Sequence, residues 1–96
     1  MDLTALIESL NEDQPPAGLA PALQALWHEA QGDWESAHLI VQTRSDPDSA
    51  WVHAYLHRVE GDDSNAAYWY RRLDKPVCSA PLKEEWEQIA SALLGR

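Results

Sequence analysis

The amino-acid sequence predicts an all-α protein of about six helices, in which two stacked antiparallel helical hairpins lie between flanking terminal helices. Two observations predict this fold. A shift of 29 residues places residues 19–47 over 48–76, and apolar side chains in both units recur at helical spacing. We therefore expect one helical-repeat domain over residues 1–96. Six positions are identical in the two units: Ala25/Ala54, His28/His57, Gly32/Gly61, Asp33/Asp62, Ala37/Ala66 and Pro47/Pro76.

Residues 1–18 are expected to form an N-terminal helix and a linker. Segment 2–10 (DLTALIESL) places its apolar residues at helical spacing. Segment 11–18 contains a Pro-Pro pair and Gly18, which predict a connector. We expect this first helix to close one end of the stack. Its apolar positions are Leu3, Leu6, Ile7 and Leu10.

The first repeat, residues 19–47, is expected to contain helices over 19–31 and 34–44. Gly32 is the expected C-cap of the first helix, and Asp33 is the expected N-cap of the second. The residues expected to face the core are Leu23, Leu26, Trp27 and Ala30 in the first helix, and Ala37, Ile40, Val41 and Arg44 in the second.

The second repeat, residues 48–76, follows the same plan with helices over 48–60 and 63–73. Asp46 and Pro47 predict where it starts, because Asp caps a helix and Pro fits a first helical turn. A Gly-Asp pair again separates the two helices. The expected core positions are Val52, Tyr55, Leu56 and Val59, followed by Ala66, Trp69, Tyr70 and Leu73.

Residues 77–96 are expected to form a C-terminal capping helix. Ser79 is a candidate N-cap for a helix over 80–94. No third Gly-Asp pair follows at the next 29-residue step, so we expect this helix to end the array and close the stack. Its apolar positions are Leu82, Trp86, Ile89, Ala90 and Leu93.

The chain is strongly acidic, and its charged residues are unevenly distributed. The formal net charge is −9, and residues 1–35 carry seven acids with no Lys or Arg. Such a chain repels phosphate backbones and anionic membranes, so nucleic acid and anionic membranes are poor partners. A basic protein or a cationic ligand is still compatible with this charge, and the alternative is that the acids serve only to keep a small protein soluble. Cys78 is the single cysteine, so no intrachain disulfide is expected. No secretory leader or membrane-spanning run is recognisable, which favours a cytoplasmic protein.

The segments 32–37 (GDWESA) and 61–66 (GDDSNA) resemble the inter-helix turn of tetratricopeptide repeats. In that family a small residue follows the Gly by five positions and another precedes it by seven, as Ala37 and Ala25 do here. The resemblance covers residues 19–76 and implies a scaffold that binds proteins. Segment 50–72 also resembles a group of small, uncharacterised bacterial helical proteins.

His53 and His57 are separated by four residues and therefore lie on one side of a helix. That spacing suits a shared metal ion, to which Glu60 could add a carboxylate. Two histidines are too few ligands, however, and His57 has a repeat twin in His28, which favours a role in packing between the units. On a helical wheel this face lies away from the core, so it is either solvated or covered by a neighbouring helix.

The next helix carries a second polar stripe. With the two histidines it could line one cleft for a carboxylate, a phosphate or a peptide C-terminus. The alternative is that its arginines pair with surface acids. No cofactor motif is present. The candidate ligand-binding residues are His53, His57, Asn65, Tyr68 and Arg72.

The favoured hypothesis is a small module that binds a protein or peptide. Exposed aromatic and arginine side chains, the types enriched at binding hot spots, would form the contact surface. The alternative is a small-ligand or metal site, with or without enzymatic activity, centred on the helix of His53 and His57. A homodimer is also compatible with the sequence. The candidate contact residues are Trp51, Tyr55, Arg58, Tyr68 and Arg72.

Overall fold

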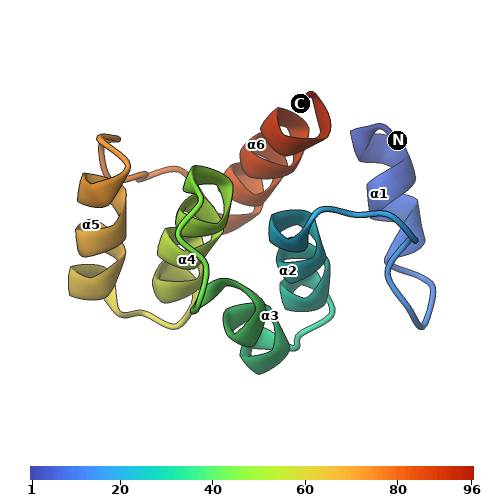
Figure 1. Cartoon of the computed structure of the whole chain (residues 1–96), viewed down its shortest axis with the longest axis horizontal. Coiled ribbons are helices and arrows are strands. Elements are labelled where there is room, and N and C mark those ends of the chain that lie inside the picture. The colour runs from blue at the N-terminus through green and yellow to red at the C-terminus, as the bar shows by residue number, and fades with distance from the viewer.

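A computed structural model describes all residues from 1 to 96 and contains six α-helices and no strand, which confirms the all-α prediction (Figure 1). Short loops connect most helices, and the longest connections precede α2 and α6. The helices are α1 (Leu3–Ser9), α2 (Pro21–Ala30), α3 (Trp34–Val41), α4 (Pro47–Val59), α5 (Asp63–Arg72) and α6 (Leu82–Leu94).

The two repeats have the same turn geometry. Gly32 and Gly61 both have a φ of +84°, a left-handed conformation that glycine adopts without a Cβ clash. The amide of the following aspartate then donates to a histidine carbonyl, from Asp33 to His28 and from Asp62 to His57, at 2.9 Å in both cases. The Gly-Asp turn of the 29-residue sequence repeat therefore has the same structure in both units.

Both aspartates also cap the helix that follows them. The Asp33 carboxylate accepts from the Ser36 amide, and the Asp62 carboxylate accepts from the Asn65 amide. These bonds satisfy amides at the helix start that have no partner within the helix. The predicted caps of α3 and α5 are confirmed.

The stack runs in chain order, with α2 against α3, α3 against α4, and α4 against α5 (Figure 1). The main hydrophobic core joins side chains from all helices except α5, and a smaller cluster joins α4 to α5 through Ala54, Ala66 and Tyr70. Indole N–H groups tie distant segments together: Trp86 donates to the Leu26 carbonyl at 3.0 Å, and Trp34 donates to the Leu56 carbonyl at 2.7 Å.

Helix α6 differs from its predicted place. It begins at Leu82 rather than at residue 80, and Ser79 does not cap it; its N-cap position is Pro81, which makes no side-chain cap bond. It also does not close the stack beyond α5. Trp86, Ile89 and Leu93 belong to the main core instead, so α6 lies across α2 and α4 and against α1. Figure 1 shows the two chain termini near each other at the top of the molecule.

Two other helix limits differ from the prediction by two residues or more, and the remaining limits agree to within one residue. Helix α2 begins at Pro21 rather than at residue 19, and α3 ends at Val41 rather than at Arg44. Arg44 was expected to face the core, but its side chain is exposed and its Nε bonds Asp46 at 3.0 Å and Ser49 at 3.1 Å. The reason is local. Pro47 disfavours helical backbone in the residue before it, and Asp46 is extended and caps α4.

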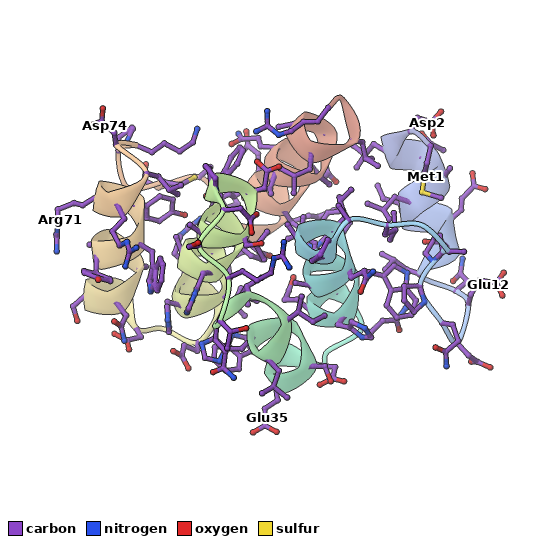
Figure 2. The ribbon with its side chains drawn as sticks, in the orientation of Figure 1. Met1, Asp2, Glu12, Glu35, Arg71 and Asp74 are labelled. Carbon is purple, nitrogen blue, oxygen red and sulfur yellow. The ribbon has the colours of Figure 1, made fainter.

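The surface carries much of the charge. In Figure 2 the side chains of Glu12, Glu35 and Arg71 point away from the body of the molecule. None of the six helices combines the length and the apolar character needed to cross a membrane.

The inter-repeat turn gives a direct test of the fold. Gly61→Ala should lower the free energy of unfolding by about 1–2 kcal/mol, because an L-residue is strained at this positive φ. Gly95→Ala is the matched control. Gly95 has a φ of −82° and its Cβ would meet only ordinary contacts, so no loss of stability is expected there. Urea denaturation measures both, and equal effects would contradict the proposed role of the turn.

Candidate functional site

Three histidines gather between α3 and α4. His53 and His57 come from α4, and His38 comes from α3. The Nε2 atoms of His38 and His53 are 3.1 Å apart, and one ring nitrogen from each of the three residues lies within 4.8 Å of the others. The sequence analysis singled out two members of this cluster and missed His38.

The cluster is buried because α3 covers the outer face of α4. His53 is 5% exposed and His57 is 7% exposed. Trp34 anchors this arrangement. Its indole donates to a carbonyl of α4, and its ring stacks on His38 with centroids 4.7 Å apart. The helical wheel left open whether the face of α4 that carries His53 and His57 is solvated or covered by a neighbouring helix. In the structure this face is covered.

Helix α5 forms the other wall of the cluster. The Trp69 ring stacks on His53 with centroids 4.0 Å apart. The guanidinium of Arg72 lies over the same indole, 4.8 Å from its centroid, at a distance typical of a cation–π contact. Trp69 is thus half-buried between an imidazole and a cation, rather than fully in the core as its periodicity predicted.

Burial favours the neutral forms of His53 and His38. Desolvation, followed by the nearby charges of His57 and His38 when protonated, lowers the pKa of His53 to about 4. Desolvation also lowers the pKa of His38, with a further contribution from His57. At pH 7 both rings therefore lack a positive charge.

The hydrogen bonds of the cluster are incomplete. The Glu60 carboxylate lies 2.7 Å from Nδ1 of His57, which must donate because a carboxylate can only accept. In the neutral form of this imidazole, Nε2 of His57 then carries the lone pair. Nδ1 of His53 is buried and has no hydrogen-bond partner.

The other predicted ligand-binding residues do not join the cluster. Asn65 lies at the start of α5 and bonds the capping carboxylate of Asp62 at 2.9 Å. Tyr68 is 44% exposed on the outer side of α5, where Arg72 donates to its hydroxyl at 3.1 Å. The five residues expected in one cleft are therefore divided between a buried histidine cluster and an exposed face of α5.

The predicted contact surface is also divided. Tyr55 is 3% exposed and belongs to the main core. Trp51 and Arg58 do share a face, as their spacing predicts, but both side chains bind Glu85 of α6. These three residues are therefore not free for a partner in the way that the sequence analysis expected. A contact role for Tyr68 and Arg72 remains a prediction.

Glu85 is the buried acid that sequence reasoning missed. It is 1% exposed, and its two oxygens accept from Arg58 at 2.6 Å, from Tyr70 at 2.5 Å and from Trp51 at 3.3 Å. Arg58 also donates to the Ala80 carbonyl at 2.6 Å. This network links α4, α5 and α6. Its only sequence signal was the shared face of Trp51 and Arg58.

An apolar cleft of about 370 Å³ opens between the terminal helices and the repeats. Inside it the Tyr55 hydroxyl donates to Glu29 at 3.2 Å, and burial raises the pKa of that carboxyl. The cleft is lined from α1 by Ile7 and Leu10, from α2 by Glu29 and Ala30, from α4 by Tyr55, and from α6 by Leu82, Lys83, Trp86 and Glu87.

Comparison with known protein families, with curated proteins and with solved structures finds no match for this chain. The resemblance to tetratricopeptide repeats therefore stays a prediction. The protein is an all-α array of two helical hairpins with terminal helices, and it contains a buried histidine cluster and an apolar cleft.

The Glu85 network predicts a strong dependence of stability on one carboxylate. Glu85→Gln keeps the shape of the side chain but leaves the Arg58 guanidinium without its counter-charge, so we expect a loss of about 2–3 kcal/mol in the free energy of unfolding. Glu84→Gln on the exposed side of α6 is the matched control, with an expected loss below about 1 kcal/mol. Chemical denaturation of both variants distinguishes them, and similar losses would mean that the network contributes little.

Proposed function

We propose that this protein is a binding module for a short segment of a partner protein, which places an apolar side chain in the cleft between α1, α2, α4 and α6. The observation that carries this proposal is the apolar lining together with two uncovered side chains at the cleft, Ile7 at 40% and Leu82 at 39% exposure. Large apolar side chains left in water beside a hollow are a common mark of an interaction site.

The charges around the cleft favour a basic segment. Two carboxylates, Glu29 and Glu87, line the cleft with a single cation, Lys83. The first 35 residues, which supply one wall, carry seven acids and no Lys or Arg. A Lys or Arg next to the apolar anchor of the partner would therefore find an opposite charge at the edge of the cleft.

Glu29 gives this preference a specific anchor. Its carboxyl is half-buried and already accepts one hydrogen bond from Tyr55, and burial raises its pKa. A guanidinium or ammonium placed beside it would offset the desolvation that disfavours its charged form. The partner's cation and the Glu29 carboxylate would thus stabilise each other.

The remainder of the fold supports this use. Helix α6 is tied to the repeats by the bond from Trp86 to Leu26 and by the Glu85 network, so the wall of the cleft that α6 supplies is held in place without a partner. A preformed site loses little conformational entropy when it binds. The resemblance to tetratricopeptide repeats, which serve mostly as protein-binding scaffolds, supports the same function as an analogy of fold.

The test uses two matched peptide sets, in which one central Leu, Phe or Trp is flanked either by Lys and Arg or by Asp and Glu. Fluorescence polarisation should detect binding of the basic set only, and added salt should weaken it because exposed charges are screened. Equal binding of both sets, or of neither, would contradict the proposed function.

Variants locate the binding surface. Leu82→Gln and Ile7→Gln should each weaken peptide binding by roughly tenfold or more, which corresponds to losing an apolar contact worth about 1.4 kcal/mol. Leu39→Gln is the control, because Leu39 is 63% exposed on α3 and does not line the cleft. If Leu39→Gln weakens binding as much as Leu82→Gln does, the cleft is not the site. If light scattering shows a dimer that Leu82→Gln dissociates, a second copy occupies the cleft in place of a peptide.

A further inference from the structure

The geometry of the histidine cluster points to a further site. We infer that His38, His53 and His57 bind one divalent transition-metal ion, with Zn²⁺ as the expected ion. This inference concerns the interface of α3 with α4 and α5, and it rests on no part of the proposed peptide binding.

The distances fit a shared ion. Zinc binds histidine nitrogen at about 2.0–2.1 Å in a tetrahedral arrangement, so two ligand nitrogens lie about 3.3 Å apart. The Nε2 atoms of His38 and His53 are 3.1 Å apart. A ring nitrogen of His57 lies within 4.8 Å of the nitrogens of the other two residues.

The second shell fits as well. A histidine that binds a metal commonly donates its other N–H to a carboxylate, which fixes the tautomer and the ring orientation. Glu60 lies 2.7 Å from Nδ1 of His57 in this role and leaves Nε2 for the ion.

The hairpin fold does not require these imidazoles. At the repeat-equivalent positions the chain has Gln24 in place of His53 and Ala67 in place of His38, although the turn geometry is the same in both units. Only His28, the equivalent of His57, is kept. The three-histidine cluster thus occurs at one of the two equivalent places, and it leaves a buried nitrogen of His53 without a partner.

The surroundings suit a bound ion. Trp34 stacks on His38 and Trp69 stacks on His53, so the two indole rings cover two sides of the cluster and limit access of water. His38 is half-buried, so an ion would enter on its side. Three protein ligands leave the fourth position of a tetrahedral ion to water or to an external ligand. Because His38 belongs to the first repeat and the others to the second, the ion would bridge the two units.

The test is titration of the metal-stripped full chain with Zn²⁺ by calorimetry, and with Co²⁺ by its visible absorption spectrum. We expect one ion per chain and the intense Co²⁺ bands of four-coordinate geometry. Zn²⁺ at about a hundred times its Kd should raise the unfolding temperature by roughly 10 °C or more, since it binds only the folded state. Absence of binding by the folded wild-type chain would overturn the inference.

Single substitutions then identify the ligands. His38→Gln, on the half-buried side, should weaken Zn²⁺ binding by more than about 100-fold, and Glu60→Gln should weaken it by about 10- to 100-fold. His28→Gln, the repeat twin of His57, is the control and should bind as the wild type does. Circular dichroism verifies that each variant is folded. Unchanged binding in folded His38→Gln would place any ion at His57, Glu60 and Asp62 instead and would overturn the three-histidine site.

Discussion

Helix α4 is enclosed by α2, α3, α5 and α6, and the rest of the structure depends on this enclosure. Seven of its thirteen residues carry a polar group in the side chain, yet most of the helix is buried. A polar group that is removed from water must find a partner or lose free energy. Three of the neighbouring helices therefore supply a hydrogen-bond partner to α4 as well as apolar contacts: Glu29 from α2, His38 from α3 and Glu85 from α6. Helix α5 contributes the Trp69 ring, which stacks on His53.

This constraint explains why the polar features of the molecule are separate rather than gathered in one cleft. Seven residues after Trp51, Arg58 faces α6 again, so both reach the same buried carboxylate. Tyr55 faces α2, where its hydroxyl meets the apolar cleft. His53 and His57 face the groove between α3 and α5. One central helix thus positions a salt-bridge network, the floor of a cleft and an imidazole cluster on three of its sides.

The sequence was sufficient to predict the features that depend on local rules. The Gly-Asp turns, the caps at Asp33, Asp46 and Asp62, and the i, i+4 pair of His53 and His57 all follow from residues close together in the chain. His38 and Glu85 could not be predicted in this way, because their contacts depend on how α3 and α6 lie against α4, and on the rotation of each helix about its axis. The place of α6 was missed for the same reason: its amphipathic pattern identifies a buried face but not the helices that cover it.

The contact between α6 and α1 has a consequence for how this small array assembles. An open solenoid is extended by one unit at a time, and each unit needs only its neighbour. Here the last helix packs against the first, and the two chain ends lie near each other (Figure 1). Met1, Leu3, Leu94 and Gly95 line a shallow hollow at this place. Helix α6 packs against α1, α2 and α4, so this final helix must be present before the earlier ones can bury all of their apolar faces. Folding should then be a single cooperative event rather than a stepwise addition of units.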